Sequence, residues 1–422
     1  MNAALFIGSE RPIGMPRILH GNFDFEHELA RTGYNRPRLL ERLNAELSTH
    51  LLAIAEDGDF LFSGDAGLTD FLTDSAAAGF SCVRSAESEK LPIHGAEFVP
   101  WGCSRPAILL AASKGWNFNG PSPESVAAVN SRAFSFELER RLDSAIPGAV
   151  EIDSVDTLQA AIRSAADVWN RSAEAFDWLV KAEFGMSGRE RISGSGILPD
   201  DSQVHWIRRR LVSGERLYFE PRVESFGELS SQWIIPQAEF DDRSSAEPEL
   251  IGTTQLLVDQ SGQYLGSVLI NTASTESPGP VSGDKGFSFS RHTLKRVLDD
   301  ARSVAEESRQ AGYHGPLGID SMVYRGSNGE SALRSIQDVN ARFTMGRIAL
   351  EWFRRFAATD RPAWLLVSEA WLSDRGIEAS LDNPIARLTS PYVVAGQPVR
   401  RVGVLIDDPG DWRDLLATDL RP

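Results

Sequence analysis

Two short apolar segments, each carrying an acidic residue, constrain the fold of this chain more than any other feature. The first segment, residues 318–323, contains Asp320, and the second, residues 337–342, contains Asp338. The stretch between them, residues 324–330, is polar and rich in the glycine and asparagine that form hairpin turns. The pattern predicts an antiparallel hairpin in which Asp320 and Asp338 lie side by side.

Two neighbouring carboxylates require something that offsets their repulsion. At about 4 Å they repel by roughly 4 kcal/mol at an effective dielectric of about 20, unless one is protonated, water separates them or a cation neutralises both. Asp320, Asp338 and Asn340 form an oxygen-rich set that suits Mg²⁺ or Mn²⁺. Arg342, on the same strand face as Asn340, has the shape to bind a phosphate. We interpret the hairpin as a nucleotide–metal site, and the alternative is a pair of solvated acidic residues.

Composition limits the class of protein. The chain has 422 residues, of which 42% are apolar and 24% charged, as in a globular protein of two or three domains. Its net charge of −16 argues against nucleic acid as the main partner, because such binding depends on Lys and Arg. The N-terminal residues lack the basic segment of a signal peptide, and no apolar run approaches the roughly 18 residues of a membrane span. We therefore expect a cytoplasmic protein without a membrane partner. Cys82 and Cys103 predict neither a disulfide framework nor a metal knuckle.

A lysine followed by a glycine loop is a second candidate site. Lys181 ends an apolar strand over residues 178–182, and Gly185, Ser187 and Gly188 follow closely. Glycines let backbone N–H groups approach an anion, and the lysine adds a positive charge. The spacing is neither that of a P-loop nor that of a dinucleotide fingerprint. A hairpin turn with an exposed lysine is the alternative.

Further candidates lie on either side of this loop. Arg132, at the start of a helix, is a second phosphate contact if that helix faces the cleft, and otherwise a solvated arginine. The segment from Glu220 to Val223 closes a strand at a proline, which leaves backbone groups that an adenine edge can use. Glu224 and Glu228 then lie within reach of a ribose. The alternative is an edge strand that meets a loop.

Taken in order, these segments resemble the ATP-grasp superfamily over about residues 1–360. Asn130-Ser131-Arg132 is similar to the family's Asn-x-Lys, with Arg in place of Lys. Residues 179–188 resemble its glycine loop, residues 219–223 its adenine hinge, and residues 312–320 the strand that enters its metal site. Residues 337–342 resemble its Glu-x-Asn-x-Arg motif, with Asp338 where Glu is usual.

The resemblance implies an α/β plus α+β fold with the nucleotide in a cleft between two lobes. The implied parts are a pre-ATP-grasp α/β domain (1–119), a first lobe with the glycine loop (120–213), a second lobe with the metal site (214–360) and a C-terminal extension (361–422). We expect a strand at 5–7 and another at 60–62, a helical segment over 38–53, a strand at 204–207 and a helix that begins after Ser290. These expectations follow from apolar spacing and capping residues.

The resemblance also implies a set of site residues. ATP is expected to contact Arg132, Lys181, Gly185, Ser187, Gly188, Glu220, Val223 and Glu228. The metal ligands are expected to be Asp320, Asp338 and Asn340, and Lys181 and Arg342 are the expected catalytic residues.

The implied activity is an ATP-dependent ligase that joins a small-molecule carboxylate to an amine, such as an amino acid or peptide, through an acyl phosphate. The chain resembles poorly characterised ligases linked to peptide formation. Dimers are common in the family, so a homodimer is one candidate state, but the sequence does not fix it. The alternatives are a small-molecule kinase and a nucleotide-binding module without turnover.

Overall fold

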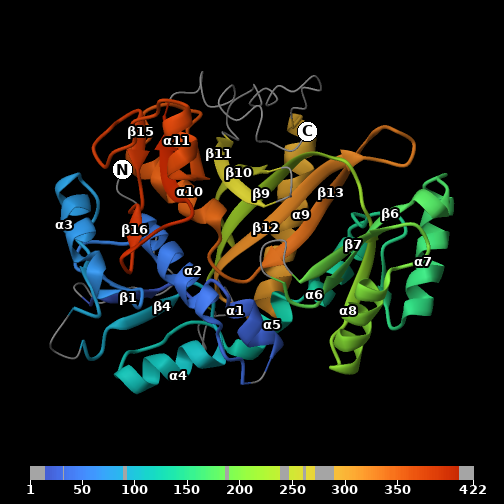
Figure 1. The fold of residues 1–422 in the computed structure, drawn as a ribbon, viewed down its shortest axis with the longest axis horizontal. Helices are drawn as coiled ribbons and strands as arrows, with labels where there is room; N and C mark the ends of the chain where they lie inside the picture. Colours follow the sequence, from blue (N-terminus) through green and yellow to red (C-terminus); the bar gives the residue numbers. More distant parts are fainter. Residues whose placement is uncertain are drawn as a thin grey trace.

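The computed structural model describes residues 15–31, 33–88, 93–185, 190–237, 247–259, 263–270 and 289–407. Figure 1 shows an N-terminal part in blue, a second part in green and a third in yellow to red. The strand expected at residues 5–7, and the loop residues Ser187 and Gly188, lie outside the described ranges. None of the helices within those ranges combines the length and apolar character needed to cross a membrane.

The N-terminal part is a parallel sheet in the order β3-β2-β1-β4. Its central strand carries Ile18 and Leu19, both buried, as expected for a parallel strand covered on both faces. The strand expected at 60–62 and the helical segment expected at 38–53 are confirmed. The elements are β1 (Arg17–His20), α1 (Phe25–Ala30), α2 (Arg38–Ser48), η1 (Thr49–Ala53), β2 (Phe60–Phe62), η2 (Ala66–Leu68), α3 (Thr69–Ala77), β3 (Arg84–Ser85), β4 (Glu97–Pro100) and α4 (Arg105–Lys114).

The second part is a four-stranded antiparallel sheet in the order β5-β8-β6-β7. Two helices share its core, through side chains such as Ile162 and Ile207 that pack with Trp178 of the sheet. The elements are α5 (Pro123–Val129), α6 (Arg132–Arg141), β5 (Val150–Ile152), α7 (Val155–Val168), η3 (Ala173–Ala175), β6 (Asp177–Ala182), β7 (Arg191–Ser195), α8 (Asp201–Val212) and β8 (Leu217–Pro221).

Two expectations for this region differ from the structure. Residues 204–207 lie in helix α8 and not in a strand, because Asp200 and Gln203 form a reciprocal capping box that starts a helix. Strand β8 pairs with β5 and β6, so the small sheet extends past residue 213, where the boundary between lobes was expected. The end of β8, at Pro221, lies beside the cleft described below.

The third part is an eight-stranded antiparallel sheet in the order β13-β12-β9-β10-β11-β14-β18-β15. Residues 363–406 supply three of its strands, so the expected C-terminal extension continues this sheet. The elements are β9 (Ser225–Ile235), β10 (Glu249–Val258), β11 (Tyr264–Ile270), α9 (Arg291–Gln310), β12 (Gly315–Arg325), β13 (Ser331–Asn340), α10 (Met345–Phe356), β14 (Ala363–Val367), α11 (Glu369–Asp374), β15 (Ala386–Leu388) and β18 (Val402–Ile406), with β16 (Val393–Val394) and β17 (Gln397–Pro398) paired separately.

Two helices support the part of this sheet that carries the candidate site. Helix α9 begins after Ser290, as expected, because the Ser290 hydroxyl accepts a hydrogen bond from the Thr293 N–H. It packs against β9 and β13 through a buried stripe that includes Val297, Ala301 and Val304. Helix α10 packs against β10 and β11. Its first turn borders the cleft between the two sheets.

Candidate active site

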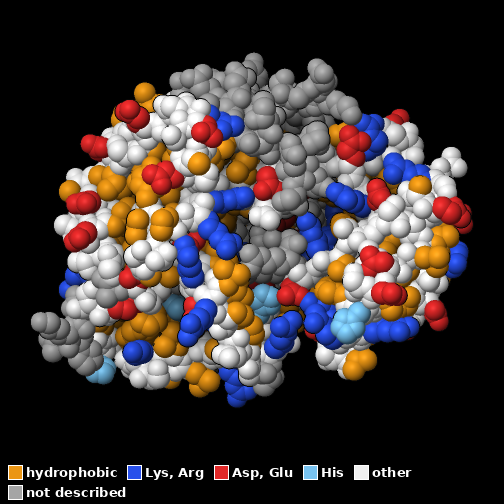
Figure 2. All heavy atoms as spheres, viewed as in Figure 1, with side chains coloured by type: hydrophobic (Ala, Val, Ile, Leu, Met, Phe, Trp, Pro, Cys, Tyr) orange, Lys and Arg blue, Asp and Glu red, His pale blue; other side chains and the backbone are white. Residues whose placement is uncertain are grey.

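A cleft of about 460 Å³ lies between the four-stranded and the eight-stranded sheet. A volume of this size is within the range of about 300–1,000 Å³ that small-molecule sites occupy. Although the whole chain is acidic, Lys and Arg side chains gather around the middle of the face shown in Figure 2. The cationic side chains that line the cleft are Arg132, Lys181, Arg191, Arg222, Arg334 and Arg342.

Asp320 and Asp338 are direct register partners on β12 and β13. The predicted hairpin is therefore confirmed. Asp320 is fixed from two sides: Ser230 Oγ donates to its Oδ1 at 2.6 Å, and Asn340 Nδ2 donates to its Oδ2 at 3.1 Å. Burial, with the charge of Asp338 added, raises the pKa of Asp320 to about 7 despite the Ser230 hydrogen bond. A positive charge beside this carboxyl group would stabilise its ionised form.

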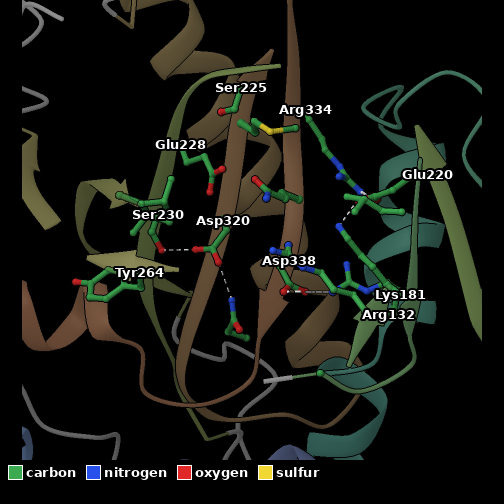
Figure 3. Close-up of a pocket in the computed structure, with 18 of the residues that line it drawn as sticks. Arg132, Lys181, Glu220, Ser225, Glu228, Ser230, Tyr264, Asp320, Arg334 and Asp338 are labelled. Atoms are coloured by element: carbon green, nitrogen blue, oxygen red, sulfur yellow. Dashed lines mark hydrogen bonds and ion pairs between the residues drawn. The ribbon is translucent and has the colours of Figure 1, made fainter. Parts of the chain in front are cut away.

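Asp338 faces the opposite wall of the cleft. Its side chain is 37% exposed, and Arg132 Nη2 lies 3.4 Å from Asp338 Oδ2. Arg132 Nε is buried and has no hydrogen-bond partner. A buried donor left unpaired is costly, and an anion in the cleft would satisfy it. Figure 3 shows Arg132 and Lys181 together on this side, across from Asp320.

A relay of hydrogen bonds connects Asp320 to the start of helix α10. Thr344, the N-cap residue, donates to Gln232 Oε1 at 2.6 Å, and Gln232 Nε2 donates to Ser230 Oγ at 2.7 Å. Ser230 then donates to Asp320. Glycine is required where the relay passes between sheet and helix, since a Cβ on Gly318 would collide with Thr344, and one on Gly346 would lie 2.9 Å from Gln232 Nε2. Each hydrogen bond of the relay is donated in the direction of Asp320, and the last one holds the Asp320 carboxylate in one orientation.

A buried ion network joins the two walls of the cleft. Lys181 on β6 forms an ion pair with Glu220 on β8, and Arg334 on β13 lies 3.0 Å from Glu220 and 2.9 Å from Glu139 of α6. Burial alone would raise the pKa of Glu220, but the charges of Arg334 and Lys181 outweigh it and hold that pKa well below its usual range. Because its members come from both sheets and from α6, the network fixes the spacing of the walls.

Arg342 lies between the cleft and the N-terminal part. Its Nε donates to Glu26 Oε1 of α1 at 2.8 Å, and its Nη2 donates to Asn340 Oδ1 at 2.8 Å. The guanidinium also lies over the ring of Trp101, 5.7 Å from its centre. Arg342 is therefore held in place at the edge of the cleft, which it lines.

The donor set fits a magnesium ion through the two aspartates. Within the described ranges, no group of three or more His, Cys, Asp or Glu side chains is arranged to hold a metal. A cation here would rest on Asp320 and Asp338, with waters and phosphate oxygens as its other ligands, which is the environment that Mg²⁺ prefers. The side-chain oxygen of Asn340 is engaged by Arg342 and its amide by Asp320, so Asn340 in this arrangement orients its neighbours.

Comparison with known proteins identifies the fold. No family model and no curated protein matches the sequence. The structure is similar to N5-carboxyaminoimidazole synthetase from Staphylococcus aureus, with a TM-score of 0.50 and 8% identity over 98% of this chain and 100% of that chain. The chain has the ATP-grasp fold. Matches also include biotin carboxylase from Campylobacter jejuni (TM-score 0.48, 12% identity, 93% of this chain and 87% of that chain) and a putative ATP-grasp superfamily protein from Archaeoglobus fulgidus (TM-score 0.44, 12% identity, 93% and 98%).

Within the ATP-grasp fold, the sequence-predicted site residues that the structure describes come together. The cleft is lined by Arg132, Lys181, Gly185, Glu220, Val223, Glu228, Asp320, Asp338, Asn340 and Arg342. Ser187 and Gly188 lie outside the described ranges. Glu228 lines the cleft, whereas Glu224 forms an ion pair at 2.7 Å with the partly exposed Arg325. Of the two ribose candidates, Glu228 is therefore the one placed at the site.

Sequence reasoning missed several residues that hold this candidate site in place. Arg334 lies four residues before Asp338 on β13, so the alternation of a strand offered a signal for it. Ser230 and Gln232 gave no signal, because small polar residues in a strand are common. Glu26 and Glu139 gave none either, since each reaches its partner from a helix that is distant in the sequence.

Proposed function

We propose that the protein is an ATP-dependent carboxylate–amine ligase, which forms an amide or peptide bond through an acyl phosphate and releases ADP and phosphate. One observation carries the proposal: Lys181 and Arg132 lie on one wall of a cleft whose opposite wall presents Asp320 and Asp338. Phosphoryl transfer requires little from a protein beyond positioning and charge neutralisation, and this pair of walls supplies both.

In this proposal the nucleotide lies along the smaller sheet. Arg132, with its unpaired Nε, and Lys181 bind phosphate oxygens. The end of β8 from Glu220 to Val223 contacts the adenine edge, and Glu228 contacts the ribose. The side chain of Glu220 is committed to Lys181 and Arg334, so its contribution to ATP is through the backbone. Gly185, which lines the cleft, is placed to contact the phosphates through its backbone.

Asp320 and Asp338 would hold Mg²⁺, which when bound supplies charge neutralisation at the phosphate oxygens. Ser230 and Asn340 hold Asp320 in the orientation that presents its carboxylate to the cleft. Arg342, fixed by Glu26, is placed to steady the transferring group. Removing one preorganised charge of this kind typically costs about 3 kcal/mol of barrier.

The reaction consists of two displacements. A carboxylate oxygen of the first substrate attacks the γ-phosphorus, the bond from that phosphorus to the bridging oxygen breaks, and ADP leaves. The amine then attacks the acyl carbon, the bond from that carbon to the phosphate oxygen breaks, and the amine loses a proton. No protein nucleophile is needed in either step.

The test is a screen of carboxylates paired with amino acids and other amines, in which ADP release is measured and products are identified by mass spectrometry. ADP release that depends on both substrates, with an amide product, supports the ligase. ADP release without an amine, together with a phosphorylated product, identifies a kinase. Tight ATP binding without ADP formation across the panel identifies a nucleotide-binding module.

A further inference from the structure

The chemical character of the cleft changes across the eight-stranded sheet. Register pairs Asp338 with Asp320, Asp320 with Ser230, and Ser230 with Thr254, so these side chains form one row from β13 to β10. The row begins with carboxylates and ends with hydroxyls. Beyond it the cleft is lined by an apolar wall that consists of Leu256, Val258, Tyr264 and Met345.

The apolar wall faces the cleft and is partly open to it. Leu256 follows Thr254 by two residues, which places it on the same face of β10. All four side chains of the wall are only half-buried. The Tyr264 hydroxyl is already hydrogen-bonded to Ser267 Oγ at 2.8 Å, so Tyr264 offers its ring to a ligand. Apolar side chains gathered in a concave site favour an apolar ligand group.

The apolar wall lies on the opposite side of the β12–β13 hairpin from Lys181 and Arg132, the cations assigned to the phosphates. Figure 3 shows Tyr264 across Ser230 and Asp320 from Lys181 and Arg132. A nucleotide whose phosphates contact Lys181 and Arg132 and whose ribose contacts Glu228 reaches the wall at Leu256, the register partner of Glu228. It leaves Val258, Tyr264 and Met345 to the second ligand of the cleft.

We propose that the acid substrate of this enzyme carries an apolar aliphatic or aromatic body, which packs on the apolar wall while its carboxylate lies beside Asp320 and Arg342. This inference rests on the proposed ligase function. Because β10 is two strands from β12, roughly 10 Å across the sheet, the body must extend several ångströms beyond the carboxylate. Acetate is too short to reach the wall. A dicarboxylate would place its second charge against apolar side chains and beside Glu228, where neither environment favours it.

The test uses the full chain saturated with Mg·ADP and titrated with acids in a calorimeter. The probes are straight-chain acids from acetate to octanoate, 3-phenylpropanoate, and adipate as the length-matched polar partner of hexanoate. We expect the Kd to fall about four-fold for each buried methylene until the wall is covered. Hexanoate should bind at least ten-fold more tightly than adipate. Equal binding of adipate and hexanoate, or affinity independent of chain length, overturns the proposal.

A variant in the apolar wall and a control variant outside the cleft test whether the wall binds the acid. Leu256→Asn is expected to weaken hexanoate binding at least ten-fold and to change Mg·ADP binding much less, because the ribose contact is assigned to Glu228 and not to Leu256 itself. Retained Mg·ADP binding also shows that the variant is folded. Leu198→Asn is the control, since Leu198 is 77% exposed and does not line the cleft. If Leu256→Asn leaves hexanoate binding unchanged, the wall is not the acid site.

Two outcomes separate this inference from the proposed function. If Mg·ADP binds and polar acids bind and support ADP release while apolar acids do not, only the apolar wall assignment fails. If Mg·ADP binds but no acid of either class binds or supports ADP release, the ligase function fails, and this inference fails with it.

Discussion

Asp320 and Asp338 are direct neighbours in the β12–β13 register, yet their surroundings differ sharply. Asp320 receives hydrogen bonds from Ser230 and Asn340 and belongs to the sheet. Asp338 is more exposed and faces Arg132 across the cleft. One carboxylate is therefore fixed by the large sheet, while the other contacts a cation of the opposite wall.

Replacing Asp338 with Ala is expected to reduce ATP turnover at least 100-fold without loss of the fold. The variant removes one of the two carboxylates proposed to hold the cation, and a missing preorganised charge costs about 3 kcal/mol of barrier. The melting temperature should stay close to that of the wild type, because the side chain is partly exposed. ADP release and Mn²⁺ binding are the measurements, with the exposed turn variant Glu330→Ala as the control. Unchanged turnover would reject the site.

Replacing Gln232 with Met is expected to raise the Mg²⁺ concentration for half-maximal activity by about 10-fold to 100-fold. The variant keeps the volume of the side chain but breaks the relay from Thr344 to Ser230, so Asp320 loses its fixed orientation. The KM for ATP should change little, because the hydrogen-bond partners of the Gln232 side chain, Ser230 and Thr344, are not among the residues assigned to the nucleotide. Direct titration with Mn²⁺ in the presence of ADP provides a readout independent of turnover.

Ser335→Ala is the matched control for that variant. Ser335 is likewise buried and hydrogen-bonded, but it lies on β13 and its hydroxyl contacts Asp300 of α9 at 2.6 Å and Ser144 at 3.0 Å. We expect it to lower stability without shifting the metal titration. A Gln232→Met enzyme with wild-type metal affinity would show that the relay does not position Asp320.

Replacing Arg334 with Met is expected to lower the free energy of unfolding by about 3–5 kcal/mol. The change leaves Glu139 and Glu220, both buried, without their shared cation. Urea unfolding measures the effect, and the double variant Arg334→Met/Glu139→Gln should recover part of the loss. Arg325→Met removes a more exposed pair with Glu224 and should have little effect. A loss no larger than that of Arg325→Met would contradict a buried network.

The stability of the protein is expected to fall with pH below about 6.5 through His50. Burial lowers the pKa of His50 to about 3, and its ring lies edge-on to Trp364. The unfolded chain takes up a proton near pH 6.5 and the folded chain does not, so the stability that is present above that pH is lost as the pH falls. The slope approaches about 1.4 kcal/mol per pH unit.

Urea unfolding of the wild type and His50→Gln at pH 7, 6 and 5 measures this contribution. The difference between the two curves isolates His50 from the carboxyl groups, and the exposed His292→Gln serves as the control. We expect the wild type to lose about 2 kcal/mol more than His50→Gln over this range. Parallel curves would show that His50 does not titrate between the two states.

The sequence predicted the β12–β13 hairpin well because its determinants are local. Apolar residues on both sides of a glycine-rich turn specify the pairing, and the pairing sets Asp320 opposite Asp338. The same reasoning failed for residues 204–207, where aromatic and β-branched residues suggested a strand. There the capping box of Asp200 and Gln203 and the burial of Ile207 against the small sheet favour a helix.

The contacts that fix the site could not be predicted from local patterns. Arg334 meets Glu139 across 195 positions, and Arg342 meets Glu26 across 316. The residues that flank Glu139 and Glu26 do not distinguish them from other acidic residues, because an acidic residue on a helix is most often solvated. The apolar wall is another example, since Leu256, Tyr264 and Met345 come from three separate elements.

Local sequence was enough to predict the hairpin that pairs the two aspartates and to propose the contacts at Lys181 and Arg132, because each depends on residues within a few positions of one another. The packing of the two sheets was needed to show that Lys181 and Arg132 face the aspartates across one cleft. It also showed that Arg334 joins the two walls through Glu139 and Glu220, and that Asn340 hydrogen-bonds both Asp320 and Arg342. The physical reason is that charges and hydrogen bonds act over a few ångströms in space, and a sequence does not record which distant segments the packing of two sheets brings within that range.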